Sequence, residues 1–253
     1  MNIVLDKKDD TAWLTIDNPP LNVLNLPMLR ELKTALDQAE DDHAIRFLVI
    51  RGSGERAFSA GVDVNDHTRD KAGDMLEAIH GIIRKLFALP HITIALVRGA
   101  CLGGGLELAS SCDLVFASED SFFATPEINV GCFPPVALAR FPALIGYHRA
   151  AEMILTGRRL TAQEASSLGL INRAVPVREL PQVVETMLRE LGGKSGAVLR
   201  IALKALRDSA VKNLFPALER SEEIYLQELL GTEDVEEGVR AFVEKRSPRW
   251  NHR

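Results

Sequence analysis

The hydrophobic positions of this chain alternate between the spacing of strands and the spacing of helices. Residues 1–17 predict two short strands around a polar turn at 7–10, and residues 45–50 form an apolar run that suits a strand buried on both faces. Between them, Asn25 is a candidate helix cap and Pro27 lies in the first predicted turn. The apolar face of that helix is formed by Leu29, Leu32, Leu36 and Ala39.

The same spacing predicts further helices. A long amphipathic helix ends at Pro90, and its apolar face consists of Met75, Ile79, Ile82, Ile83, Leu86 and Leu89. Thr161 and Glu164 form a capping box, and Gly169 is a helix stop. The last third of the chain is helical throughout, with separate helices predicted at 183–191, 197–210, 217–230 and 233–245. We therefore expect an α/β fold with a mostly parallel sheet, and C-terminal helices that cap the core or form a subunit contact.

One stretch, from residue 97 to residue 130, combines a flexible backbone with two carboxylates. An apolar strand predicted at 92–97 leads to three consecutive glycines at 103–105, which open onto a helix. Glycines admit positive φ and let a ligand approach the backbone, and the unpaired N–H groups at a helix start attract negative charge. Glu107 lies three residues into this helix, and Glu127 follows twenty residues later. The stretch therefore suggests a site that stabilises an anion during acid–base chemistry at a carbonyl compound.

A second small-residue turn, Ser59-Ala60-Gly61-Val62, strengthens this interpretation. It also follows a predicted strand, so its N–H groups and those of the glycine turn are expected to converge on one oxygen atom. Taken alone, the glycines are equally well explained by a flexible turn. They do not form a dinucleotide-binding fingerprint or a phosphate loop, because neither the G-x-G-x-x-G spacing nor a following Gly-Lys-Ser/Thr is present.

Length and composition narrow the class of protein. The 253 residues suit one large domain, or one domain with an appendage, and 46% hydrophobic residues favour a packed core. A net charge of −5 argues against nucleic acid as a partner. No apolar run approaches the roughly 20 residues of a membrane span, and the first residues lack a secretory signal pattern. The three cysteines show no C-x-x-C spacing, so we expect no disulfide, no metal site and a cytoplasmic location.

Four segments, in chain order, resemble the crotonase superfamily of enoyl-CoA hydratases and isomerases. They are Phe58-Ser-Ala-Gly-Val-Asp63, Gly103-Gly-Gly-Leu-Glu107-Leu-Ala, Cys112-Asp113-Leu and Pro126-Glu127-Ile. The resemblance continues to residues 242–246 and covers essentially the whole chain. It implies a crotonase-type spiral of ββα units at 1–195, which carries the CoA and catalytic site, and a C-terminal helical region at 196–253. In that family the helical region drives formation of homotrimers, which commonly pair into homohexamers.

The resemblance also implies a mechanism. The backbone N–H groups of Val62 and Gly104 match an oxyanion hole for a thioester oxygen that becomes enolate-like. Glu107 and Glu127 match the two catalytic glutamates of the hydratases, which add water to an α,β-unsaturated acyl-CoA. Glu107 is the expected base on the water and Glu127 the expected proton donor, with pKa values that differ because the two carboxyls share a dry pocket. CoA enters as part of the substrate, and no other cofactor is expected.

Five further positions match the path of CoA. Ala60, Asp63 and Val64 lie in and after the first turn, where Asp63 is also expected to cap a turn. Phe242 and Lys245 match positions at which the family's C-terminal helix meets the CoA nucleotide, often from a neighbouring subunit. A lysine at a helix end also complements the helix dipole without any ligand, so the role of Lys245 has two explanations.

The segment after Glu127 departs from the glycine-rich loop of most hydratases in the family. Here the run is Cys132-Phe133-Pro134-Pro135, which stiffens the expected wall beside the acyl group. No Asp or Glu occurs between residues 128 and 145, which weighs against a dienoyl-CoA isomerase or a dehalogenase. Together with residues 60–68, the run resembles the branch that hydrates cyclohexa-1,5-diene-1-carboxyl-CoA in anaerobic degradation of aromatic compounds. A short-chain enoyl-CoA hydratase of fatty-acid β-oxidation is the alternative.

Two alternative functions and several other residues bear on this prediction. An enoyl-CoA isomerase stays open because one glutamate alone can move a proton, whereas the glutamate pair and the negative charge oppose a non-catalytic RNA-binding or scaffold protein. Ser53 lacks the G-x-S-x-G setting of a hydrolase nucleophile. Asp113 is interpreted as a structural residue at a helix-to-strand bend. His67 and His80 show no metal-ligand spacing, and we expect their ring nitrogens to be satisfied locally.

Overall fold

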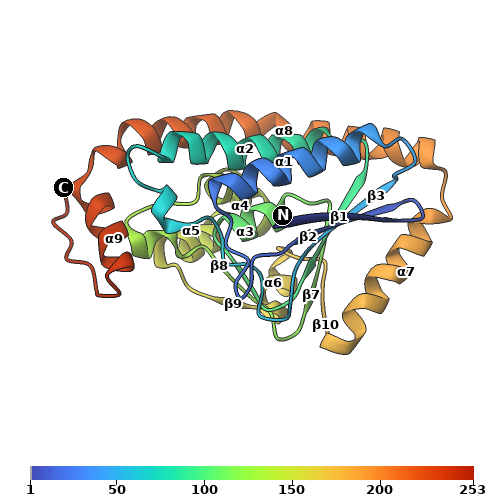
Figure 1. Ribbon diagram of the computed structural model, residues 1–253, viewed down its shortest axis with the longest axis horizontal. Coiled ribbons are helices and arrows are strands. Elements are labelled where there is room, and N and C mark those ends of the chain that lie inside the picture. Colours follow the sequence, from blue (N-terminus) through green and yellow to red (C-terminus); the bar gives the residue numbers. More distant parts are fainter. Residues whose placement is uncertain (1) are drawn as a thin grey trace.

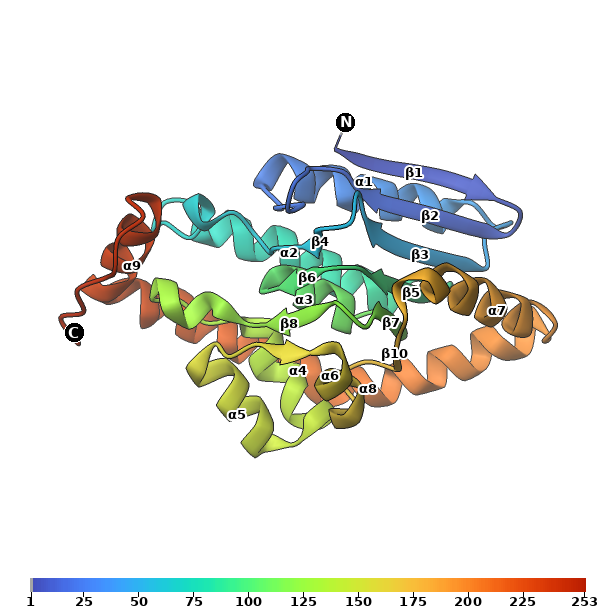
Figure 2. The ribbon, with the colours of Figure 1, turned by 90° about the horizontal axis from the view of Figure 1, so that it is seen from below.

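In the computed structural model, which describes residues 2–253, the strands form two sheets (Figures 1 and 2). The larger sheet has the order β1 (Ile3–Lys8), β2 (Thr11–Ile16), β3 (Phe47–Gly52), β5 (Ile92–Val97), β7 (Leu114–Ser118) and β10 (Arg173–Val175). The smaller sheet has the order β4 (Ala57–Ser59), β6 (Ala100–Leu102), β8 (Phe122–Ala124) and β9 (Leu160–Thr161). The antiparallel pairs are β1–β2 and β8–β9, and the other neighbours are parallel.

Helices cover the sheets, and three of them, α1, α2 and α8, run side by side along one side of the molecule in Figure 1. The α-helices are α1 (Leu26–Asp41), α2 (Ala72–Ala88), α3 (Gly104–Ser110), α4 (Pro135–Ile145), α5 (Tyr147–Thr156), α6 (Ala162–Leu168), α7 (Leu180–Gly192), α8 (Gly196–Gln227) and α9 (Glu233–Val243). Short 3₁₀ segments lie at Val64–Asp66, Pro126–Val130, Val177–Glu179 and Leu229–Gly231. Within the described chain no helix has the length and apolar character needed to cross a membrane.

A strand–strand–helix unit repeats along the chain and builds both sheets together. β3 and β4, β5 and β6, and β7 and β8 are consecutive pairs in which the first strand joins the larger sheet and the second joins the smaller one. The predicted α/β fold with a mostly parallel sheet is therefore confirmed. Because β4 and β6 are parallel neighbours, the turns that follow them come out at the same edge of the smaller sheet.

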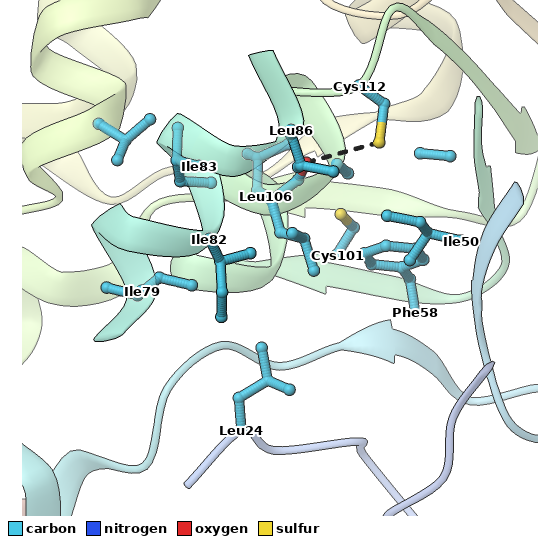
Figure 3. Close-up of a cluster of buried hydrophobic side chains, with 14 of the residues drawn as sticks. Leu24, Ile50, Phe58, Ile79, Ile82, Ile83, Leu86, Cys101, Leu106 and Cys112 are labelled. Atoms are coloured by element: carbon cyan, nitrogen blue, oxygen red, sulfur yellow. Dashed lines mark hydrogen bonds between the residues drawn. The ribbon is translucent and has the colours of Figure 1, made fainter. Parts of the chain in front are cut away.

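The core lies between α2 and the sheets (Figure 3). Ile79, Ile82 and Leu86 of α2 are almost fully buried and lie close to Phe58 of β4 and Cys101 of β6. Each such side chain contributes about 1.5–3 kcal/mol of burial free energy. The helical spacing of these residues in the sequence is thus explained by one long apolar face that packs on the strands carrying the two turns.

Asp113 has the structural role that the sequence predicts, at the bend between α3 and β7. Its Oδ2 accepts hydrogen bonds from the backbone N–H of Thr93 at 2.7 Å and from Nη2 of Arg207 at 2.6 Å. Arg207 lies on α8 and also donates to the carbonyl of His91 at 2.9 Å. These bonds attach the long C-terminal helix to the ends of the central strands, and each buried charge has a partner.

Most predicted helix boundaries are confirmed. The side chain of Asn25 caps α1 by accepting from the N–H of Met28 at 3.0 Å. Thr161 and Glu164 form the expected capping box on α6, and Gly169 ends that helix with a positive φ of 83°.

Two boundary predictions near the C-terminus are wrong. The separate helices at 197–210 and 217–230 are one helix, α8, which runs through Pro216. The fixed φ of proline is itself helical, and the N–H that is lost matters less than the buried contacts of Leu214 and Leu218 on either side. The last helix ends at Val243 and not at Lys245, because Lys245 adopts a left-handed conformation with φ 53°.

Candidate active site

The two small-residue turns approach each other closely at the edge of the smaller sheet. A Cβ atom at Gly104 would lie 2.8 Å from Cγ2 and 3.5 Å from the backbone nitrogen of Val62. A Cβ at Gly61 would lie 3.3 Å from the backbone nitrogen of Gly104. The N–H groups of Val62 and Gly104 donate no hydrogen bond to any residue in the range 2–253. The two turns thus bring two unpaired backbone donors to one place, as the sequence predicts.

Gly103 makes this approach possible. It has a φ of 51°, which side-chain-bearing residues rarely adopt, and a Cβ there would lie 2.5 Å from Oε1 of Glu127. Its carbonyl accepts the N–H of Glu107 at 2.9 Å, which is the first hydrogen bond of α3. The glycine therefore starts the helix that carries one carboxylate and leaves room for the other.

Glu107 is buried, and its carboxylate accepts a backbone hydrogen bond. It is 3% exposed on the first turn of α3, and its Oε1 accepts the backbone N–H of Ala137 at 2.9 Å. Ala137 lies in the first turn of α4, which Pro135 begins, so the proline pair places an unpaired helix-end donor on this carboxylate. Burial raises the pKa of Glu107, and the neighbouring His80 and the N–H groups of Ala137 and Val136 partly counteract that rise.

Glu127 has fewer partners than Glu107. It lies in the 3₁₀ segment Pro126–Val130, is 9% exposed, and its Oε2 has no hydrogen-bond partner within the described chain. Burial, reinforced by the negative charge of Glu107, raises its pKa to about 8. At neutral pH a carboxyl with this pKa keeps its proton, as a general acid must.

Both carboxyls and both turns line one cavity of about 440 Å³. Its walls are mostly apolar and come from α2, the segment before α4, and α9. Of the residues predicted at the CoA path and the acyl group, the structure places these in the cavity wall: Ala60, Val64, Phe133, Pro134, Pro135 and Phe242.

Three other predicted residues lie beside the cavity and not in its wall. Asp63 caps the 3₁₀ segment Val64–Asp66, because its side chain accepts the N–H of Asn65 at 2.9 Å, so its role as a turn cap is confirmed. Cys132 is 1% exposed and lies behind the wall. Lys245 follows the end of α9, and the next residue, Arg246, lines the cavity instead.

The sequence pattern does not identify two residues of the cavity wall, Tyr225 and His80. Tyr225 of α8 packs edge-on against Phe133, with 5.1 Å between the ring centres. His67 is satisfied locally as predicted, through the carbonyl of Asp63 at 3.1 Å, but the same prediction is wrong for His80. The only signal for His80 in the sequence is a polar residue beside the apolar face of α2, which does not reveal a neighbour on another helix.

Comparison with known proteins agrees with this geometry. Residues 6–253 match the enoyl-CoA hydratase/isomerase family. The chain belongs to this family. It is 31% identical over 255 residues to the cyclohexa-1,5-dienecarbonyl-CoA hydratase of Thauera aromatica, with 100% of this chain and 97% of that protein covered. It is 35% identical over 247 residues to a probable enoyl-CoA hydratase of Bacillus subtilis, with 94% of each covered. The resemblance to the crotonase superfamily is thereby confirmed.

Solved structures of the enoyl-CoA hydratase/isomerase family extend the likeness to three dimensions. The crystal structure of an enoyl-CoA hydratase from Mycobacterium avium subsp. paratuberculosis superimposes with a TM-score of 0.89, at 30% identity and 99% coverage of both chains. An enoyl-CoA hydratase/isomerase from Xanthobacter autotrophicus gives a TM-score of 0.87 at 30% identity, with 97% of both chains covered. The expected crotonase-type fold is therefore confirmed over nearly the whole chain.

Proposed function

We propose that this protein adds water across the double bond of an α,β-unsaturated acyl-CoA. The observation that carries the proposal is one apolar cavity in which two buried carboxyls, Glu107 and Glu127, lie beside the unpaired N–H groups of Val62 and Gly104. A pair of carboxyls whose environments separate their pKa values supplies a base and an acid at one pH.

The chemistry follows from these groups. The thioester oxygen accepts hydrogen bonds from Val62 and Gly104, which stabilise the negative charge that develops on it. Glu107 takes a proton from water as the water oxygen bonds to the β-carbon, and the resulting enolate takes a proton at the α-carbon from Glu127. Return of a proton from Glu107 to Glu127 through solvent restores the enzyme. The reactants are the CoA ester and water, and the protein returns to its starting protonation state.

Hydration is expected to weaken at high pH. Because Glu127 must be protonated to donate, kcat/KM should fall as pH rises through about 8, the pKa of this carboxyl. Well above that value the loss approaches about tenfold per pH unit. The measurement is kcat/KM across the pH range, and a profile that stays flat well above the pKa of Glu127 would contradict the assigned role.

For the acyl group, we propose a cyclic dienoyl thioester, cyclohexa-1,5-diene-1-carboxyl-CoA. Two observations support this choice: the relative in Thauera aromatica, and the wall at Phe133, Pro134 and Pro135, which is anchored at the start of α4 and is less deformable than a glycine-rich loop. A match to a short-chain-enoyl-CoA hydratase of Clostridium acetobutylicum supports a short-chain substrate as the second candidate.

The test is a side-by-side assay with crotonyl-CoA and the cyclic dienoyl-CoA, in which mass spectrometry detects one added water. We expect kcat/KM to be at least about tenfold higher for the cyclic substrate. Preference for crotonyl-CoA would identify a short-chain hydratase. Double-bond migration without added water would identify an isomerase and overturn the proposed hydration, as would the absence of any reaction with either substrate.

We also propose a homotrimer or homohexamer in the cytoplasm. The exposed apolar residues Val198, Ile201 and Leu206 on α8 support a subunit contact along the C-terminal helix. The buried, unpaired thiols of Cys101, Cys112 and Cys132 suit a reducing compartment.

A further inference from the structure

A histidine that the proposed mechanism does not use lies in the wall of the active-site cavity. His80 of α2 is 0% exposed and lines the same cavity as Glu107 and Glu127. Its neighbours from α2 in that wall, Met75 and Ile79, are apolar. A buried polar ring is costly in such surroundings unless both of its nitrogens have partners.

One nitrogen of His80 is fixed from behind the cavity. Its Nδ1 lies 2.5 Å from Oε1 of Glu222 on α8, and Arg84 donates to the same carboxylate at 3.1 Å. Burial raises the pKa of Glu222, but the hydrogen bonds and charges of His80 and Arg84 outweigh this and leave that pKa lowered. An ionised carboxylate only accepts hydrogen bonds, so the proton of the pair lies on Nδ1.

The other nitrogen of His80 is available to the site. Its Nε2 is buried and has no hydrogen-bond partner among residues 2–253. With a proton fixed on Nδ1, Nε2 offers a lone pair in the neutral ring and an N–H in the charged ring. A carboxylate that orients a histidine in this way is the arrangement by which proteins set the direction of a proton-transferring ring.

We propose that His80 is a positioning residue for Glu107: fixed by Glu222 through Nδ1, the ring in its charged form presents the Nε2–H to the cavity, where it stabilises the Glu107 carboxylate that removes the proton from water. This inference rests on the proposed function. Glu222 of α8 contacts His80 directly and pairs with Arg84 of α2. The other ionisable groups that line the same cavity are Glu107, Glu127, His67, Tyr225 and Arg246. The influence of His80 on Glu107 opposes the effect of burial, as described above.

The informative variant is His80→Asn. The side-chain amide of Asn retains a donor for Glu222 close to the position of Nδ1 but has no counterpart of Nε2. We expect kcat for hydration to fall about tenfold, KM to change less than about twofold, and the acid limb of kcat/KM to move to higher pH. The sign follows because loss of His80 removes an influence that lowers the pKa of Glu107, so a higher pH is needed to ionise it.

Two further variants separate this role from a structural one. Glu222→Gln removes the carboxylate that orients the ring and is expected to shift the acid limb in the same direction. Glu223→Gln, the matched control, alters the adjacent residue, whose exposed carboxylate pairs with Arg220 at 3.0 Å, and should leave the profile unchanged. If His80→Asn folds and retains the wild-type pH profile, His80 is only structural and the inference is overturned.

A readout without turnover keeps the two proposals apart. Infrared titration of Glu127→Gln, minus that of Glu127→Gln/Glu107→Gln, isolates the carboxyl signal of Glu107. Addition of His80→Asn to both proteins should move this titration to higher pH, and an unchanged titration would overturn the role of His80 even in an active hydratase. If the wild type hydrates no enoyl-CoA, the proposed function fails, and the titration still decides whether His80 acts on Glu107.

Discussion

Replacement of Glu127 with Gln is expected to lower kcat for hydration by about 10²–10⁴-fold with little change in KM. Gln has nearly the same shape and is neutral, as the protonated Glu127 is at neutral pH, so the cavity should keep its form. What is lost is the acidic proton. Glu107→Gln is expected to cause a loss of similar size because water then has no base. Steady-state hydration rates measure both effects.

The two variants should differ in a second measurement that assigns their roles. In D₂O, exchange of the α-proton of a saturated acyl-CoA requires only the group that faces the α-carbon. We expect this exchange to persist in Glu107→Gln and to disappear in Glu127→Gln. Glu119→Gln, which changes an exposed carboxylate after β7, is the matched control. Near-normal hydration in either active-site variant would contradict the two-carboxyl mechanism, and the reverse exchange pattern would interchange acid and base.

Gly104→Ala is expected to lower kcat by about 10²–10³-fold, equivalent to the loss of one oxyanion donor. The new Cβ would lie 2.8 Å from Cγ2 and 3.5 Å from the backbone nitrogen of Val62, beside one of the two donors. The backbone of Gly104 has no positive φ, and Ala is favoured over Gly in a helix by about 1 kcal/mol, so the variant should fold.

Two controls test this explanation. Gly73→Ala makes the same change in α2, where a Cβ would meet nothing within 4 Å, and should keep full activity. Val62→Ala combined with Gly104→Ala removes the crowded methyl groups of valine but leaves the new Cβ near the backbone nitrogen of residue 62, so activity should stay low. Recovery in the double variant would show that a displaced valine, and not a blocked oxyanion hole, caused the loss.

The elements of this fold were predictable where the pattern is local. The apolar stripe of α2, the Asn25 cap of α1 and the capping box of α6 depend on residues within a few positions of each other. The continuity of α8 through Pro216 depends instead on contacts with distant helices, and the pattern near that proline predicts a break. Local propensity is overridden when buried packing contributes more free energy.

The candidate site also has some features that local motifs predict and others that depend on the tertiary structure. Glu107, Glu127 and the two turns are identifiable because each lies in a short motif whose residue types suit one kind of chemistry. The pKa of about 8 at Glu127 is different in origin, since it arises from burial and from a carboxylate on another element. Likewise, the donor from Ala137 to Glu107 depends on where α4 begins relative to α3.

The sequence by itself determined the family and the α/β class and singled out the two candidate carboxyls and the two turns, because these are written in local spacing and in motifs. Only the tertiary structure decided how far each carboxyl is desolvated, and that His80, Glu222 and Arg84 meet behind the cavity. His80 and Glu222 are 142 positions apart in the chain. Contacts of that kind depend on how α2 and α8 pack, and electrostatic interactions depend on distance and burial, which residue spacing alone does not specify.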